Sequence, residues 1–213
     1  MTLKILLVDD HQMFLDGLTA ILQRFEDISQ VQSVNNGHAA LRLLKKVDFD
    51  VALIDLRLPV LDGFGVLQAA FELGILTAII VVTASNAPDD VARAKKLGAM
   101  GYISKAASSA QIVDTIVRVV NGELVFPITG RPLNSAAQAS SDYQTNWAGQ
   151  HSLTPRQLEV VRLLKQGMSN QKIADTLFVS LPTVKTHIAA IFKTLDVKSR
   201  AETISKVHQL GLD

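Results

Sequence analysis

The feature that most constrains the fold is an alternation of short apolar runs with longer amphipathic segments over the first 122 residues. The apolar runs have the length of buried strands and lie at Leu3–Val8, Val31–Val34, Val51–Ile54, Ala78–Val82 and Gly101–Ile103. The segments between and after them have helical spacing and lie at His11–Arg24, His38–Lys46, Gly63–Leu73, Asp89–Leu97 and Ser109–Asn121. Strands separated by helices need right-handed crossovers. The pattern therefore predicts a doubly wound α/β domain with a five-stranded parallel sheet.

The pattern changes twice after this domain. From residue 123 to residue 150 periodicity is lost, and Pro127, Gly130 and Pro132 indicate a flexible linker. After Leu153 the spacing is helical only, with four short helices expected near 155–166, 170–177, 181–195 and 199–210. We therefore expect an α/β domain over 1–122, a linker over 123–150 and a small all-α domain over 151–213.

Composition narrows the class of protein. The chain has 213 residues, of which 48% are hydrophobic and 19% charged, and this balance excludes an intrinsically disordered chain. It has no cysteine, which excludes disulfides, thiolate metal sites and a cysteine nucleophile. No apolar stretch approaches the roughly 20 residues that a membrane-spanning helix needs. These observations predict a soluble cytoplasmic protein with no membrane partner.

Charge is distributed unevenly along the chain. Residues 1–122 carry 11 Lys and Arg against 13 Asp and Glu, whereas residues 151–213 carry 9 against 5. A basic segment beside an acidic one suggests different partners, with a polyanion such as nucleic acid for the basic part.

Polar side chains follow the predicted strands at the edge where ligands bind in open parallel sheets. Asp9 and Asp10 follow the first strand, Asp55 the third, Thr83 the fourth and Lys105 the fifth. Carboxylates this close usually need a cation, and an all-oxygen site suits Mg²⁺. A carboxylate beside Mg²⁺ can act as a nucleophile toward a phosphoryl group, whose oxygens a hydroxyl and an ammonium would hold.

Three other interpretations of these residues are weaker than a phosphoacceptor site. Acids at strand ends can simply cap the following helices. A phosphohydrolase with an aspartyl-phosphate needs a second acid two residues after the nucleophile, but that residue is Arg57. A flavin site needs a phosphate-cradling loop after the first strand, where this chain has Asp9-Asp10-His11.

The residues Leu6–His11, Asp55–Gly63, Thr83-Ala84 and Lys105 closely resemble the receiver domain of two-component response regulators. The resemblance implies a flavodoxin-like fold in which Asp55 accepts a phosphoryl group from a histidine kinase. It implies that Asp10 binds Mg²⁺ with the help of Asp9, Asp55 and the backbone carbonyl of Arg57. Thr83 and Tyr102 match the family's switch pair, a hydroxyl that moves to the phosphoryl group and a ring that swings inward.

Several positions near this pattern carry their own expectations. Leu58 replaces a frequent methionine, and Ala106 stands where proline often follows the lysine. His11 is expected to start a helix rather than to act as a ligand or base. Apart from the switch, Tyr102 could simply lie beside a buried strand with its hydroxyl in water.

The last 60 residues resemble the DNA-binding domain of LuxR/NarL/FixJ regulators. The matching segments are Leu153–Val160, Gly167–Ala174, Val179–His187 and Lys198–Ala201. The resemblance implies a four-helix domain with a helix-turn-helix motif whose recognition helix is the predicted helix 181–195.

Helical geometry places an apolar face and a small, basic face on that recognition helix. Val184, Ile188, Ile191 and Leu195 share the apolar face, and the opposite face carries Pro182, Thr186, Ala189 and Lys193, with Lys185 on its edge. The candidate DNA contacts on this helix are Lys185, Thr186, Ala189 and Lys193. We expect Lys185 and Thr186 to meet base edges, and Lys193 and Arg200 to meet the phosphate backbone. His187 lies near the boundary of the two faces, and its role is left open.

These expectations combine into a two-component response regulator. Phosphorylation of Asp55 would control sequence-specific binding to double-stranded promoter DNA and hence transcription, with a homodimer as the active form. Apart from its own phosphorylation and dephosphorylation the chain is expected to catalyse nothing, and it needs no organic cofactor. The alternative is a phosphorylation-independent regulator or interaction protein that kept the receiver fold.

Overall fold

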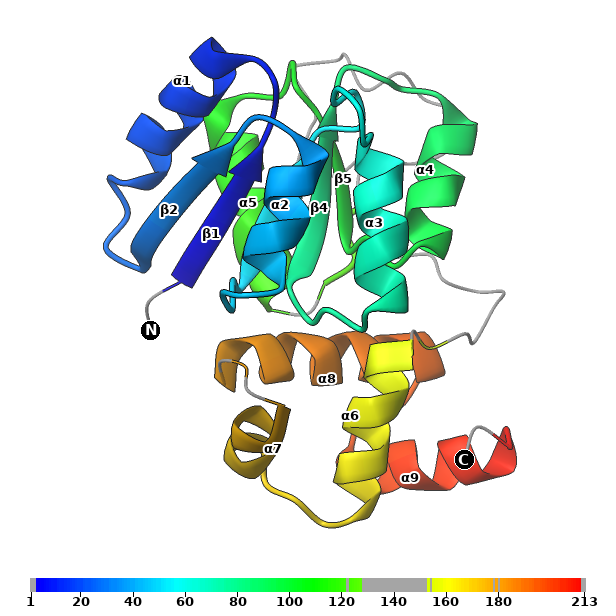
Figure 1. The fold of residues 1–213 in the computed structure, drawn as a ribbon. Helices are drawn as coiled ribbons and strands as arrows, with labels where there is room; N and C mark the ends of the chain where they lie inside the picture. The colour runs from blue at the N-terminus through cyan, green and yellow to red at the C-terminus, as the bar shows by residue number, and fades with distance from the viewer. Residues whose placement is uncertain are drawn as a thin grey trace.

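The first part of the chain is a sheet of five parallel strands with helices on both faces (Figure 1). The computed structural model describes residues 3–121, 123–127, 153, 155–177, 179 and 181–211. The strands are β1 (Leu3–Val8), β2 (Ile28–Val34), β3 (Val51–Ile54), β4 (Ala78–Thr83) and β5 (Gly101–Ser104), in the order β2-β1-β3-β4-β5. The predicted fold class is confirmed. β2 begins three residues earlier than expected.

Five helices follow the strands in turn. They are α1 (Gln12–Leu22), α2 (Gly37–Leu44), α3 (Gly63–Glu72), α4 (Pro88–Lys96) and α5 (Ser109–Val120). Side-chain caps fix several starts: Asn36 accepts from the Ala39 N–H, and Asp62 accepts from the Gly65 N–H. Ser108 and Gln111 form a reciprocal capping box at α5. These local signals set where each connection leaves the sheet.

The C-terminal part is helical among the residues that the structure describes. It contains α6 (Pro155–Lys165), α7 (Asn170–Leu177), α8 (Leu181–Leu195) and α9 (Arg200–Gln209), close to the expected bounds. The predicted apolar face of α8 is confirmed, since Val184, Ile188, Ile191 and Leu195 are buried in a second core with α6, α7 and α9.

The segment predicted to open the linker is packed instead. Leu124, Val125 and Phe126 are buried, and Val125 forms a bridge with Gly101 of β5. The Tyr102 N–H donates to the Val125 carbonyl at 2.8 Å, and the Val125 N–H donates to the Met100 carbonyl at 3.0 Å. Residues 123–127 therefore belong to the α/β core, because three apolar side chains outweigh the signal of Pro127. Residues 128–150 of the predicted linker lie outside the described part of the chain.

The helical part lies across one end of the sheet (Figure 1). Helix α8 runs beneath the amino-terminal ends of the strands and contacts α5, while α6 contacts α3. The carboxyl-terminal ends of the strands, where the polar residues were predicted, point away from it. The two ends of one sheet thus carry the two features that bear on function.

Candidate functional site

Two buried carboxylates and one lysine lie together at the carboxyl ends of the strands. Asp9, after β1, and Asp55, after β3, are 2% and 3% exposed. The Lys105 Nζ, which follows β5, lies 2.7 Å from Asp9 Oδ2 and 2.7 Å from Asp55 Oδ2. Asp55 Oδ1 is buried and has no hydrogen-bond partner among the described residues. Because a buried polar oxygen without a partner is costly, this atom fits a site that binds a cation or a phosphoryl group.

The lysine holds its charge in this setting. Burial alone would lower the pKa of Lys105, but its hydrogen bonds to Asp55 and Asp9 outweigh that effect and raise the pKa. Its ammonium also lies 5.4 Å from the centre of the Phe14 ring. Lys105 therefore stays charged and partly neutralises the acids around it.

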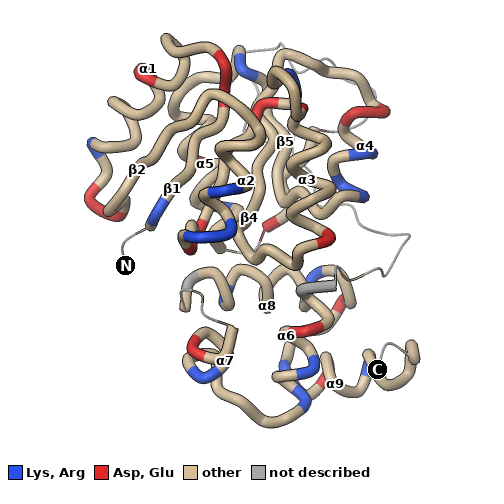
Figure 2. Tube along the Cα trace, viewed as in Figure 1, with Lys and Arg blue, Asp and Glu red and all other residues tan. Residues whose placement is uncertain are grey.

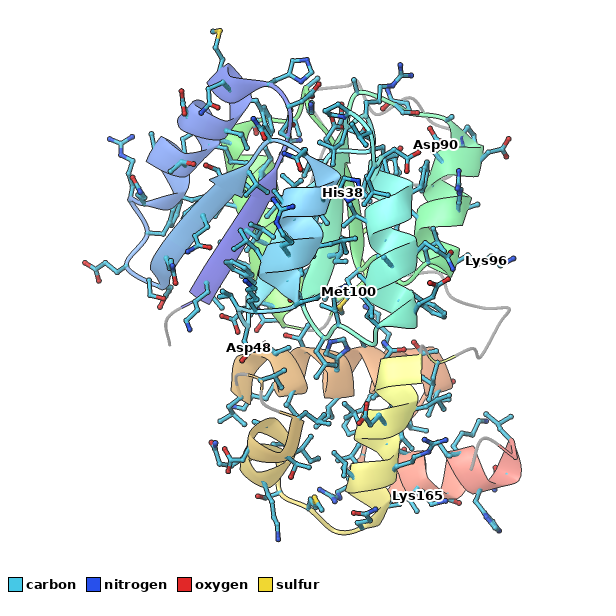
Figure 3. All side chains as sticks on the ribbon, viewed as in Figure 1. His38, Asp48, Asp90, Lys96, Met100 and Lys165 are labelled. Atoms are coloured by element: carbon cyan, nitrogen blue, oxygen red, sulfur yellow. The ribbon has the colours of Figure 1, made fainter. Side chains whose placement is uncertain are left out.

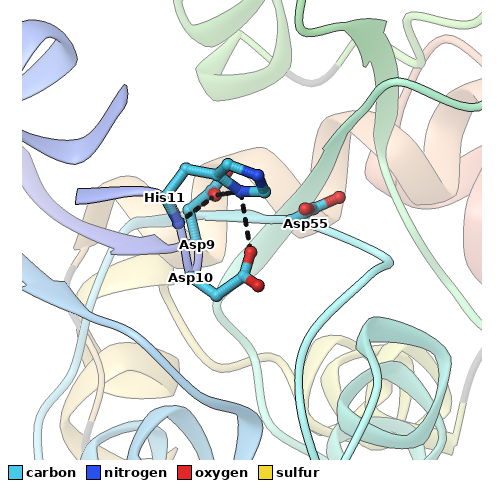
Figure 4. Close-up of side chains that lie close together, drawn as sticks. All are labelled: Asp9, Asp10, His11 and Asp55. Atoms are coloured by element: carbon cyan, nitrogen blue, oxygen red, sulfur yellow. Dashed lines mark hydrogen bonds and ion pairs between the residues drawn. The ribbon is translucent and has the colours of Figure 1, made fainter. Parts of the chain in front are cut away.

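Asp10 and His11 complete the cluster (Figure 4). The His11 Nδ1 lies 2.8 Å from Asp10 Oδ1 and 3.0 Å from Asp9 Oδ1. One ligand atom from each of Asp9, Asp10, His11 and Asp55 lies within 4.8 Å of all the others. His11 precedes α1 as expected, and in addition its ring lies against the acids of the pocket. Figure 2 shows the acidic turn between β1 and α1 at the end of the sheet away from the helical part.

The donor set fits Mg²⁺. Three carboxylates with one ammonium leave an excess of negative charge, and Mg²⁺ prefers oxygen ligands while keeping several waters. Asp10 is partly exposed, which leaves an opening to solvent. Arg57, whose carbonyl was the fourth expected ligand, lies in the loop after Asp55 with its side chain exposed.

The loop that follows Asp55 is tightly fitted. A side chain at Gly63 would meet the Asp55 carbonyl oxygen at 2.2 Å, so only glycine allows α3 to start this close to β3. Val60 has a φ of 67°, a region that β-branched residues rarely adopt, and it is 93% exposed. Leu58 is buried, in keeping with a packing role, and the peptide bond between Lys105 and Ala106 is trans. The backbone around Asp55 is held by packing on one side of the loop.

Thr83 and Tyr102 lie on neighbouring strands next to this cluster. Both are fully buried. The Thr83 Oγ1 accepts from the Ser85 N–H at 3.3 Å, and the Tyr102 hydroxyl donates to the Ser85 carbonyl at 3.0 Å. Burial raises the pKa of Tyr102 to about 12. The ring is therefore already inward, its hydroxyl is not left to water, and both residues meet at Ser85.

The second feature is the contact of α8 with the other end of the sheet. The Thr183 Oγ1 donates to Asp50 Oδ1 at 3.0 Å, and the Thr186 Oγ1 donates to the Val120 carbonyl at 2.8 Å. The His187 ring bonds to the Leu76 carbonyl through Nε2. All three α8 side chains are buried. Thr186, which was predicted to contact DNA, and His187, whose role was left open, thus bind the α/β part.

Apolar side chains cross the same boundary. Ala190 of α8 is fully buried within the core of the α/β part, and Leu76 is buried within the core of the helical part. Met100 lies at the end of the α/β part nearest α8 (Figure 3) and lines a small cavity with His187 and Gln157. Asp48 lies near the same boundary, and burial raises its pKa. Side chains of both parts are therefore buried at the boundary between α8 and the sheet.

The candidate DNA contacts are divided by this boundary. Thr186 is buried against α5, and Ala189 is partly buried. Burial lowers the pKa of Lys193, with Glu123 raising and Arg118 lowering it, so the lysine faces the α/β part. Lys185 is exposed. The face predicted to enter a DNA groove is therefore mostly covered.

Arg200 has a different environment from the one expected. Its guanidinium donates to the Met168 carbonyl at 2.6 Å and to the Leu164 carbonyl at 2.5 Å. Arginine near a helix C-terminus satisfies the last carbonyl oxygens and the helix dipole. Arg200 thus connects α9 to the end of α6. This role could not be predicted from the sequence, because every residue type has the backbone carbonyl that Arg200 binds.

None of the helices that the structure describes is both long and apolar enough to span a membrane.

Comparison with known families agrees with both halves of the chain. Residues 5–117 match the family described as response regulator receiver domain, and residues 151–207 match bacterial regulatory proteins, luxR family. The chain is 32% identical to the nitrate/nitrite response regulator protein NarL of Escherichia coli (strain K12), over 96% of this chain and 94% of that protein. It is 33% identical to the transcriptional regulatory protein LiaR of Bacillus subtilis (strain 168), over 97% of each.

A solved structure supports the fold of the first part. The signal receiver domain of a NarL response regulator from Mycobacterium tuberculosis is 30% identical. It aligns with a TM-score of 0.52 over 55% of this chain and 94% of that one.

Proposed function

Because this chain belongs to the response regulators that join a receiver domain to a LuxR-type DNA-binding domain, we propose that Asp55 is its phosphoacceptor. The observation that carries the proposal is the buried Asp55 carboxylate, which is paired through Oδ2 with Lys105 and has no partner at Oδ1. An oxygen of this carboxylate attacks the phosphorus of a histidine kinase's phosphoimidazole, the P–N bond breaks, and the imidazole leaves.

The residues around Asp55 have separate tasks in this transfer. The carboxylates of Asp9, Asp10 and Asp55, with the Arg57 carbonyl, would hold Mg²⁺, which neutralises charge on the transferring phosphoryl group. Lys105 already lies 2.7 Å from Asp55 and would hold a phosphoryl oxygen once the acyl phosphate forms. The Thr83 hydroxyl would hold a second oxygen. The chemistry is self-modification, so the chain acts as a regulator rather than as an enzyme on other substrates.

We propose that the unphosphorylated receiver blocks DNA binding. The observation that supports this is the burial of Thr183, Thr186 and Ala190 of α8 against the receiver, because a helix cannot enter a major groove while that face is packed. Phosphorylation would move Thr83 and Ser85, and with them Tyr102, whose N–H is bonded to residue 125. The cytoplasmic partners are a sensor kinase, double-stranded promoter DNA and a second copy of the active chain.

We retain 1–122 and 151–213 as the two functional units, with 123–127 packed on the first. The test is to treat the full chain and Asp55→Asn with acetyl phosphate and Mg²⁺, then measure intact mass and promoter binding. We expect one phosphoryl adduct on the natural chain, none on the variant, and tighter DNA binding only after phosphorylation. An equal adduct on Asp55→Asn would overturn the assignment. Equal DNA binding with and without phosphate would favour the phosphorylation-independent alternative.

A further inference from the structure

His11 precedes α1, and its carbonyl accepts from the N–H groups of Phe14 and Leu15, but its side chain does not cap the helix. It is the N-cap residue of α1, with φ −92° and ψ 99°, and its side chain makes no capping hydrogen bond. The ring instead turns back over the acids, with Nδ1 at 2.8 Å from Asp10 Oδ1 and 3.0 Å from Asp9 Oδ1 (Figure 4). Its backbone N–H also donates to Asp9 Oδ1 at 2.9 Å. Both the backbone and the ring of His11 therefore face the phosphoacceptor pocket.

The position of Nδ1 is that of a donor atom in a shared site. Nδ1 contacts Asp10 and Asp9 at 2.8 and 3.0 Å, and one nitrogen of the same ring lies within 4.8 Å of one oxygen each of Asp9, Asp10 and Asp55. Asp55 is 97% buried, and its Oδ1 has no hydrogen-bond partner among the described residues, which is an independent sign that the pocket is built for a ligand. One nitrogen and three carboxylate oxygens together make a mixed donor set.

The charges in the pocket leave room for a dication. Among the described residues, the three carboxylates face the ammonium of Lys105, which lies 2.7 Å from both buried acids and 3.5 Å from His11 Nδ1. Lys105 thus acts as the resident cation when no metal is bound, and a divalent ion would remove the remaining excess of negative charge.

A nitrogen donor changes which dication such a pocket prefers. Mg²⁺ favours oxygen ligands, whereas imidazole suits the later first-row metals. From this geometry we propose that His11 is a further protein ligand, through Nδ1, and that it gives the pocket an affinity for cobalt-, nickel- or zinc-like dications beyond what three carboxylates supply. This inference takes the location of the pocket from the proposed function and adds metal specificity to it.

The experiment uses Co²⁺ and Mg²⁺ as probes with the full chain, His11→Asn and His38→Asn. Asn is itself a favoured N-cap, so His11→Asn should keep α1 folded. His38 is an exposed histidine on α2 and is not part of the donor cluster, which makes it the matched control (Figure 3). Affinities are measured by calorimetry, and the proton NMR spectrum of the Co²⁺ form is searched for a shifted, exchangeable imidazole N–H signal.

We expect His11→Asn to weaken Co²⁺ binding by at least about tenfold and to abolish the shifted N–H signal. Mg²⁺ binding should change by less than about threefold, since imidazole adds little for an oxygen-preferring ion. The control should retain all three properties. Equal losses for Co²⁺ and Mg²⁺ would overturn the proposal by making His11 an organiser of the acids, and so would unchanged Co²⁺ binding. Phosphorylation of His11→Asn by acetyl phosphate with Mg²⁺ tests the proposed function separately.

Discussion

The two ends of the receiver sheet do different physical work. At the carboxyl end, Asp9 and Asp55 are buried beside Lys105, so the arrangement depends on charge, and a metal ion or phosphoryl group bound there would change its charge balance. At the amino end, Thr183 and Thr186 of α8 form hydrogen bonds of 3.0 and 2.8 Å, and Ala190 packs into the core. A charged site can be switched by ligand chemistry, whereas a packed boundary can only be opened or closed.

In the proposed mechanism, the signal has to cross the sheet from its carboxyl end to its amino end. Tyr102 connects the pocket with the segment after α5. Its hydroxyl donates to the Ser85 carbonyl near the pocket, and its N–H donates to the Val125 carbonyl. Glu123, two residues before Val125, pairs with Arg118 at 2.9 Å. Burial lowers the pKa of Lys193 on α8, and the charge of Glu123 opposes that effect. In this structure the inward ring of Tyr102 and the buried face of α8 occur together.

The largest effect should come from removing the resident cation of the charged end. Lys105→Met removes the ion-pair partner of the buried Asp55 and one of the partners of Asp9, and breaking such a buried pair costs about 3 kcal/mol of unfolding free energy. Mg²⁺ should restore most of that loss by replacing the missing charge. Urea unfolding with and without Mg²⁺ measures both values. The exposed Lys96 of α4 gives the control Lys96→Met, and equal destabilisation of the two variants would contradict the account of the pocket (Figure 3).

At the packed end, Leu76→Lys should open the boundary. Leu76 is 3% exposed and lies in the core of the helical domain, so losing its burial costs about 2 kcal/mol of closed-state stability. Unphosphorylated Leu76→Lys should therefore bind promoter DNA roughly 30-fold more tightly than the natural chain when little of the latter is open. Leu73→Lys adds the same charge at a side chain that is 53% exposed, and it should bind like the natural chain. Fluorescence anisotropy gives the affinities.

Two lysines of α8 should contribute differently to DNA binding by the phosphorylated chain: Lys185 by contacting bases and Lys193 by contacting phosphates. Lys185→Ala should cost on the order of 1–3 kcal/mol on the cognate site and relax base preference. Lys193→Ala should weaken binding to all sequences and reduce the salt dependence by about one unit. Titrations on cognate and scrambled DNA at several salt concentrations compare them. Equal loss on both DNAs for Lys185→Ala would make it a phosphate contact.

The smallest effect concerns Tyr102, whose burial raises its pKa to about 12. Between its usual value of 10.0 and about 12, the folded chain keeps the phenol proton that the unfolded chain loses. Stability should therefore be lowered as the pH rises through that window, and the contribution is present in full below it. Ultraviolet titration should show a late phenol transition that Tyr102→Phe removes. A single transition near pH 10 in both proteins would contradict this environment.

The sequence predicted the charged end better than the packed end. The carboxyl ends of parallel strands meet at one edge of the sheet. Acidic, hydroxyl and amine side chains that follow those strands therefore predict a shared site in whatever order the strands pair. Here these side chains are Asp9, Asp55, Thr83 and Lys105. Thr186 and Ala190 are small residues that suit a DNA groove and a protein boundary equally well, so helical periodicity alone could not choose. The turn of His11 toward the acids also depends on side-chain rotation, which spacing does not encode.

If the receiver covers α8 until Asp55 is phosphorylated, the distance between α3 and α7 should change on phosphorylation. The chain has no cysteine, so Glu72→Cys on α3 and Lys172→Cys on α7 give two unique sites for spin labels on exposed residues. Pulsed electron paramagnetic resonance should give one narrow distance distribution without phosphodonor. With acetyl phosphate and Mg²⁺ the distribution should become longer and broader, but not when Asp55→Asn is added. An unchanged distribution in a sample whose intact mass shows full phosphorylation would contradict the account.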